Sequence, residues 1–199
     1  MKTKIILLFT LLLMVNMVLI AQAPEWQWAT KAGGIFTDEG RSLAVDDGGN
    51  IYVTGTFAGT ATFGSYTLYS SGENDIFVAK MDATGIWQRA IQAGGGSDDS
   101  GYRITIDDAG NSYVTGYFED TATFGSYTLY SSGYDDIFVA KIDEDGNWLW
   151  ATKAGGTYWD KGNGITIDDA GNSYVTGFFT EQQLLVRMIL PAVDLRIFL

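Results

Sequence analysis

The chain has 199 residues, of which 46% are apolar and 14% aromatic, with 25 glycines and 2 prolines. This length suffices for one domain with a sizeable core, and the composition favours an ordered, turn-rich β protein over a disordered chain. There is no Cys and no His. Their absence excludes disulfides, Cys and Ser–His nucleophiles, and thiolate or imidazole zinc sites. The net charge of −12 disfavours nucleic acid and anionic lipid as partners.

The first residues have the order of a secretory signal peptide. Lys2 and Lys4 precede an apolar run over residues 5–20, and the small-residue sequence "AQA" follows at residues 21–23. We expect residues 1–23 to be removed. Because Pro24 is a poor residue beside a scissile bond, cleavage after Ala21 is the alternative. Loss of the two lysines would take the net charge to −14. The alternative is an uncleaved membrane anchor. The favoured reading predicts a secreted or cell-surface protein with no stable membrane insertion after signal removal.

From residue 24 on, one unit recurs every 61 residues. The copies are "DDGGNIYVTG" and twice "DDAGNSYVTG" (from Asp46, Asp107 and Asp168), "DIFVAK" (from Asp75 and Asp136), and "WQWATKAGG", "WQRAIQAGG" and "WLWATKAGG" (from Trp26, Trp87 and Trp148). A strict period of this kind predicts a stacked or circular array of one supersecondary unit.

Each unit contains four short runs rich in Val, Ile, Tyr, Phe and Thr, separated by turn residues. In the first complete unit these runs are residues 41–47, 50–57, 75–82 and 86–95. Runs of this length and composition are typical of strands, and four linked antiparallel strands form the blade of a β-propeller. The sequence therefore predicts an all-β fold. A β-solenoid is the alternative, although its repeats are usually shorter.

The segments "VDDGGNIYVTGTF", "IDDAGNSYVTGYF", "DIFVAKMDATGIW" and "DIFVAKIDEDGNW", followed by "KAGG", resemble the bacterial seven-bladed-propeller (SBBP) repeat family. The resemblance covers residues 25–180 and implies a propeller in an exported or surface protein. It implies no reaction, because the family has no general catalytic motif. The copy number departs from the family. We therefore expect residues 24–180 to form two full blades plus partial ones, an open arc and not a closed ring.

An Asp followed three residues later by Gly marks the tight turns, as at Asp46–Gly49 and Asp82–Gly85. The favoured reading is structural, because Gly readily adopts the positive φ of such hairpins and the Asp carboxylate accepts backbone N–H groups. The alternative is calcium, the one cofactor considered, although the ligand spacing of an EF-hand is missing. Its candidate ligands are Asp46, Asp47, Asn50, Asp107, Asp108, Asn111, Asp168, Asp169 and Asn172.

Between the second and third strands, both complete units carry the identical insert "TATFGSYTLYSSG" (residues 60–72 and 121–133). We expect an extra hairpin bending near "FGSY", on the face opposite the Asp–Gly turns. Its rings could bind a sugar or a protein, or could pack the hairpin onto its own blade. These candidates are Tyr66, Tyr69, Tyr127, Tyr130 and Tyr134. For Trp87 and Trp148, burial between blades is the favoured role.

The third copy of the repeat gives way to an unrelated tail at residues 181–199. With permitted codons, the tail read in a shifted frame restores the insert and matches residues 59–78 at 15 of 20 positions. We therefore expect a frameshift at codon 181, and a truncated repeat array that is marginally stable or prone to aggregation.

These observations favour a fragment of an exported, non-enzymatic propeller that acts as a binding or interaction scaffold with a protein or carbohydrate ligand. No catalytic residue stands out. The alternatives are a glycan-binding module using the Tyr-rich insert, and the remnant of a larger secreted enzyme.

Overall fold

The computed structural model describes residues 25–180, 189–190 and 193–198. The predicted signal peptide lies outside the described residues, as does most of the predicted aberrant tail. The described residues form strands joined by turns. Among them, no helix has the length and apolar character required to span a membrane.

The first complete 61-residue unit folds as a blade of four antiparallel strands, as predicted. These strands are β2 (Asp38–Val45), β3 (Ile51–Phe57), β6 (Asp75–Met81) and β7 (Trp87–Gly95). They pair in the order β2-β3-β6-β7. The insert forms the hairpin of β4 (Thr60–Phe63) and β5 (Tyr66–Tyr69), with its bend between Phe63 and Tyr66.

The second blade repeats this plan with longer strands. It consists of β8 (Ser100–Ile106), β9 (Ser112–Phe124), β10 (Tyr127–Ile142) and β11 (Trp148–Ala154). The insert hairpin is here continuous with β9 and β10, since Thr121–Phe124 pairs with Tyr127–Tyr130 at their ends. The two copies of the insert therefore adopt the same hairpin.

Shorter elements lie at the two ends of the array. The two-residue strand β1 (Ala32–Gly33) pairs with β4, and β12 (Asp160–Ile167) pairs with β13 (Ser173–Phe179) as the first half of a third blade. Beyond it, β15 (Val193–Phe198) pairs in parallel with β13 and antiparallel with β14 (Ile189–Leu190). In the complete blades the corresponding neighbour of the second strand is antiparallel.

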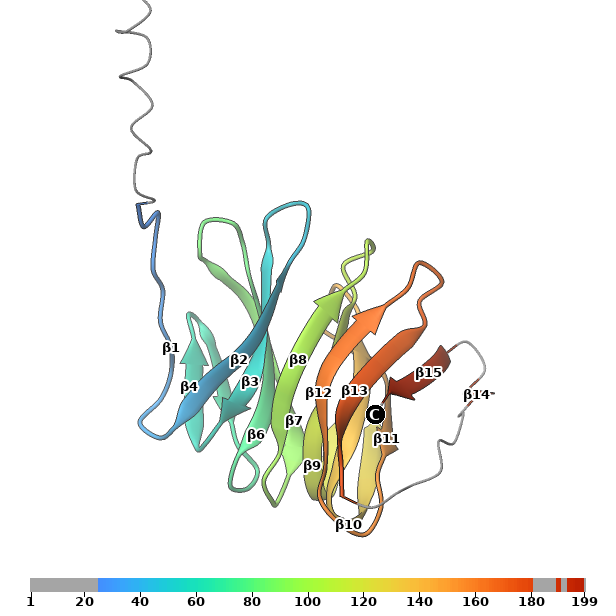
Figure 1. Ribbon diagram of the computed structural model, residues 1–199. Coiled ribbons are helices and arrows are strands. Elements are labelled where there is room, and N and C mark those ends of the chain that lie inside the picture. Colours follow the sequence, from blue (N-terminus) through green and yellow to red (C-terminus); the bar gives the residue numbers. More distant parts are fainter. Residues whose placement is uncertain (1–24, 181–188, 191–192, 199) are drawn as a thin grey trace, which may run out of the picture.

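The blades stand side by side in an arc, with the first strands β2, β8 and β12 next to one another (Figure 1). The turns after β2, β6, β8 and β12 lie on one face, at the top of Figure 1. The crossovers between blades lie on the opposite face, as the alternation of strand direction predicts. The described sheets do not close into a ring.

Most of the buried core lies in the central strands and between neighbouring blades. Ile104 of the second blade packs in one cluster with Tyr52, Ile76 and Val78 of the first blade. A second cluster lies under the insert hairpin, where Phe63 contacts the half-buried Trp87 edge to face at 5.2 Å between ring centroids. The indole N–H of Trp87 donates to the Lys31 carbonyl, 3.4 Å away. Trp87 therefore lies between the insert hairpin and Lys31, the residue that precedes β1.

Candidate functional site

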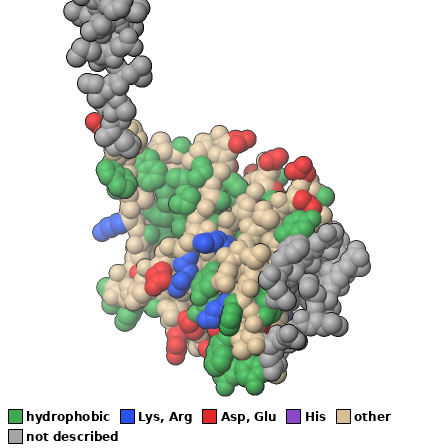
Figure 2. All heavy atoms as spheres, in the orientation of Figure 1, with side chains coloured by type: hydrophobic (Ala, Val, Ile, Leu, Met, Phe, Trp, Pro, Cys, Tyr) green, Lys and Arg blue, Asp and Glu red, His purple; other side chains and the backbone are tan. Residues whose placement is uncertain are grey.

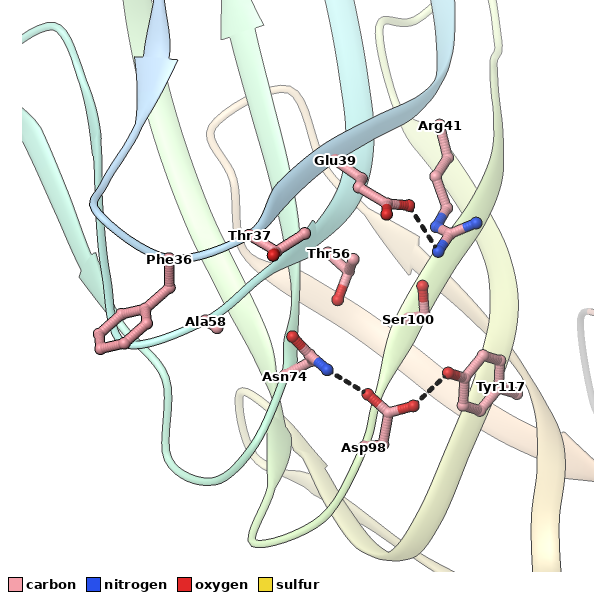
Figure 3. A pocket seen from close by; sticks show the side chains of 10 residues that line it. All are labelled: Phe36, Thr37, Glu39, Arg41, Thr56, Ala58, Asn74, Asp98, Ser100 and Tyr117. Atoms are coloured by element: carbon pink, nitrogen blue, oxygen red, sulfur yellow. Dashed lines mark hydrogen bonds and ion pairs between the residues drawn. The ribbon is translucent and has the colours of Figure 1, made fainter.

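A polar pocket of about 380 Å³ opens where the first two blades meet. Its wall comes from β2, β3 and the loops beside them on one side, and from β8, β9 and the crossover before β8 on the other (Figure 3). The lining residues are Phe36, Thr37, Glu39, Arg41, Thr56, Ala58, Asn74, Asp98, Ser100 and Tyr117.

Asp98 is the centre of a hydrogen-bond network that joins the blades. The Asn74 amide donates to one carboxylate oxygen at 2.7 Å, and the Tyr117 hydroxyl donates to the other (Figure 3). Burial, with the hydrogen bond to Asp98, raises the pKa of Tyr117 and keeps its hydroxyl protonated as a donor. The orientation of the Asp98 carboxylate is therefore fixed.

An ion pair lies across the pocket from Asp98. The guanidinium of Arg41 lies 2.7 Å from the Glu39 carboxylate and stacks over the ring of Tyr102 at 4.8 Å. Both charged side chains are partly exposed, so the pair contributes little to stability. Its charges remain available to a bound molecule.

Ser100 is a buried polar residue of the pocket whose hydroxyl has no hydrogen-bond partner among the described residues. Its side chain is 1% exposed, and its hydroxyl makes no hydrogen bond to described residues. By contrast, the neighbouring Thr56 hydroxyl donates to the carbonyls of Asp75 and Asp99. A buried hydroxyl with no partner costs about 1–3 kcal/mol, and Ser100 lies in the wall of this pocket.

The first junction is the one between the first two blades, and the second junction is the one between the second and third. Comparison of the two shows why the first junction contains a pocket. One period after Ser100 the sequence has Lys161, whose ammonium lies 2.8 Å from Asp135 and 3.9 Å from the Tyr117 ring centroid. One period after Asp98 it has Trp159, which stacks on Tyr134. Long side chains thus occupy at the second junction the positions that Ser100 and Asp98 hold at the first.

The repeat pattern does not point to the pocket residues, because they differ between the copies. Ser100 corresponds to Glu39 and Lys161 in the other copies, and Asp98 to Thr37 and Trp159. The signal that could have found them is this departure from the repeat at the residues that flank one crossover.

The structure divides the five predicted tyrosines into two groups. Tyr69 and Tyr130 are each 65% exposed, and Tyr134 and Tyr66 are exposed to a lesser degree. Tyr127 is half-buried and donates its hydroxyl hydrogen bond to the Leu149 carbonyl of the fourth strand. Tyr127 therefore attaches the hairpin to its blade, whereas the rings of Tyr69 and Tyr130 are largely exposed.

The Asp–Gly turns have the predicted hairpin geometry. Gly110 has φ +79° and donates its N–H to the Asp107 carbonyl at 2.9 Å. The Asp107 carboxylate accepts from the backbone and side chain of Asn111 at 2.9 and 2.8 Å, and the turns at Asp46 and Asp168 repeat these contacts. Hydrogen bonds from Asn172 lower the pKa of Asp168 to about 2.

These contacts bear on the calcium alternative. The carboxylates of Asp46, Asp107 and Asp168 already accept hydrogen bonds inside their own turns. Nowhere in the described ranges do three or more Asp or Glu side chains gather in a way that could hold a metal ion.

A pair of buried aspartates lies at each blade junction. An ideal Cβ placed on Gly94 would lie 2.7 Å from an oxygen of Asp75 and 2.9 Å from one of Asp99, so the two carboxylates converge there. Burial raises the pKa of Asp99 to about 8 and that of Asp75 to about 6. At the second junction, Lys153 lies 2.7 Å from the corresponding Asp136.

These blades define the class of protein: an incomplete, open β-propeller built from repeated four-stranded sheets. A family model described as SBBP, beta-propeller repeat, matches residues 27–56, 88–117 and 149–177. The chain therefore contains three copies of the SBBP repeat, as the resemblance of its motifs predicted.

A relative from Acanthamoeba polyphaga mimivirus, "Uncharacterized WD repeat-containing protein L264", is 37% identical over 62 residues. The match covers 31% of this chain and 4% of that protein. The matched segment is thus a small part of a much longer relative, and the similarity supports a repeat scaffold.

Proposed function

We propose that this chain is an exported, non-enzymatic binding scaffold whose pocket between the first two blades takes a neutral, polyhydroxylated ligand such as a sugar ring. The buried Ser100 hydroxyl without a hydrogen-bond partner is the observation that carries the proposal. Acceptors on Glu39 and Asp98, donors on Arg41 and the ring of Tyr117 surround it. Such a mixture suits the hydroxyl groups and apolar faces of a carbohydrate.

The second blade junction suggests the matched test. A Ser100→Lys, Asn74→Asp, Asp98→Trp variant would copy into the first junction the Lys161–Asp135 pair of the second, together with its Trp159. We expect this variant to fold, because the repeat accommodates the pair at 2.8 Å, and to lose ligand binding because the lysine fills the pocket.

The measurement is a glycan-array screen of the parent protein, followed by calorimetry of the best glycan with each variant. Ser112→Ala is the control, since Ser112 is also buried without a hydrogen-bond partner but does not line the pocket. Equal binding by the parent protein and the Ser100→Lys, Asn74→Asp, Asp98→Trp variant would exclude this pocket as the site.

The exposed rings of Tyr69 and Tyr130 favour a second candidate, a glycan or protein ligand on the insert hairpins. Changing both to Ser removes aromatic area without removing core packing. If binding is lost in this variant and retained in the pocket variant, the ligand surface lies on the hairpins.

Export is supported by the order of Lys2, Lys4, the apolar run and "AQA". Mass spectrometry of the protein recovered from the medium or cell surface is expected to show a mature N-terminus at Gln22 or Pro24. Retention of Met1 in exported material would support an uncleaved anchor.

A further inference from the structure

The first strand of each blade contains a β-bulge. The pairing with the second strand shifts register at Arg41 in β2, at Tyr102 in β8 and at Asn163 in β12. A bulge leaves its extra residue outside the ladder and redirects that side chain, and bulges recur beside binding sites. The repeat therefore presents a different bulge side chain from each blade.

The three bulge residues line one cavity of about 490 Å³, which we call the bulge cavity. Glu39, Gly40 and Arg103 complete its lining. Since β2, β8 and β12 lie next to one another, the bulge cavity crosses the first strands of all three blades (Figure 1). It shares Glu39 and Arg41 with the pocket at the first junction, so the two hollows adjoin.

The bulge cavity is a basic region of an acidic protein. Its wall holds two guanidinium groups and one carboxylate, although the chain has a net charge of −12. Figure 2 shows Lys and Arg side chains gathered over the middle of this face. The carboxylate, that of Glu39, is paired with Arg41. Among the described residues, no carboxylate forms an ion pair with Arg103.

Backbone carbonyls position the Arg103 guanidinium. One of its terminal nitrogens lies 3.3 Å from the carbonyl oxygen of Arg41 and 3.5 Å from that of Tyr102. Within the described part of the chain, Nε and the other terminal nitrogen make no hydrogen bond. These two nitrogens form a planar fork of donors, and such a fork matches the two oxygens of a carboxylate.

Neutral polar groups lie beside this fork. The ring of Tyr102 is held between the Arg41 guanidinium, 4.8 Å from its centroid, and the Tyr117 ring, which it meets edge to face at 5.4 Å. Asn163 is exposed and adds an amide that can both donate and accept. Hydroxyl groups of a ligand therefore have partners next to the position of its carboxylate.

We propose that the ligand of this protein is an acidic oligosaccharide, whose uronate residue occupies the bulge cavity and pairs its carboxylate with Arg103. The proposal rests on the proposed function for the neutral ring in the adjoining pocket. Because Glu39 already compensates Arg41, the remaining cation suits a single negative charge. A carboxylate fits better than a sulfate, since its two oxygens lie in the plane of the guanidinium fork.

An array of oligosaccharides that join one uronate to neutral sugars provides the probe, with each printed as the free acid and as its methyl ester. The ester keeps every ring and hydroxyl but removes the charge. The free acid is expected to bind about tenfold more tightly or better, because the ester loses the charge-assisted pair. In the ¹⁵N-labelled full chain, the best acid should shift the Arg103 Nε–H resonance saturably.

Two Gln variants separate the fork from overall charge. Arg103→Gln should weaken binding of the acid by about tenfold or more and leave the ester unchanged. Arg103 is exposed, so this change does not disturb the core. Lys31→Gln is the control, since it removes the same charge from an exposed residue that lines neither hollow. It should bind the acid as the parent protein does.

Equal affinity for acid and ester, or for the acid in Arg103→Gln and the parent protein, would overturn the proposal and leave the neutral pocket in place. Absence of binding by every acid, or a preference for sulfated sugars on the same array, would also overturn it. Acid binding that needs Arg103 but survives in the Ser100→Lys, Asn74→Asp, Asp98→Trp variant would support the carboxylate contact and contradict the proposed pocket.

Discussion

At the scale of single residues, the two blade junctions differ in the charges that surround their buried aspartate pairs. Each buries two aspartates beside a glycine, but the second junction places Lys153 beside Asp136, whereas the first has Gln92 at the corresponding position. Among the described residues, one oxygen of Asp75 has no hydrogen-bond partner, and the same is true of one oxygen of Asp136. Since the ionised pair is not compensated by a cation at the first junction, a proton shared between Asp75 and Asp99 is favoured.

Asp75→Asn should therefore stabilise the protein at pH 8, because the amide can donate to Asp99 without adding charge. Asp136→Asn should destabilise it, because it leaves Lys153 without its buried partner. Urea titrations of both variants and the parent measure the two effects. The opposite order of stability would refute the difference between the junctions.

The same pair predicts how stability depends on pH. The folded pKa values of Asp75 and Asp99, about 6 and about 8, lie above the usual value of about 3.9 for an unfolded chain. The folded state thus holds more protons, and the stability it gains at low pH is lost as pH rises through these values. We expect the free energy of unfolding to fall by about 4 kcal/mol between pH 5.5 and 9. In the Asp75→Asn variant the slope of the free energy of unfolding against pH should be smaller. An unchanged slope would show that Asp75 and Asp99 do not cause the pH dependence.

Gly110 tests the turn assignment at the same scale. Its φ of +79° is strained for an L residue with a side chain, so Gly110→Ala is expected to cost about 1 kcal/mol in urea titration. An Ala variant as stable as the parent protein would contradict the turn geometry.

At the scale of elements, the insert hairpin could be predicted as a local structure, but its partner could not. Alternation in "TATFGSYTLY" and the bend at "FGSY" are visible in the sequence, and β4 and β5 form there. The pairing of Gly94 with Thr123 depends on how neighbouring blades are placed relative to each other, which a local sequence pattern does not determine. The pocket could not be predicted for the same reason, since Ser100 and Tyr117 meet Asn74 only across a junction.

The pairing makes a specific prediction for the element. Gly95→Val should destabilise the first blade junction by several kcal/mol, because its Cβ would overlap the Thr121 carbonyl oxygen. Thermal unfolding against Gly96→Val as the matched control measures the cost. Equal melting temperatures would show that the hairpin does not pair with this strand.

At the scale of the whole molecule, the first blade has an uncovered side. Leu43 on β2 is 62% exposed, whereas Ile104, one period later, is 6% exposed because the first blade covers it. Val45 is 55% exposed beside it. Figure 2 shows hydrophobic side chains gathered over this part of the arc.

This uncovered side supports the expectation of a marginal, association-prone chain. Leu43→Lys, Val45→Thr should reduce concentration-dependent association in sedimentation velocity without lowering the melting temperature, because neither residue is in a packed cluster. A parent protein that stays monomeric at high concentration and melts sharply would contradict the expectation.

The central claim is that each 61-residue repeat forms a four-stranded blade joined to its neighbour through the insert hairpin. Nuclear Overhauser effects between the backbones of Gly94 and Thr123, and between those of Gly33 and Thr62, test it most directly. The account predicts both cross-strand contacts, with matching patterns one period apart. Their absence in a folded protein, or contacts that place the two inserts in different conformations, would contradict it.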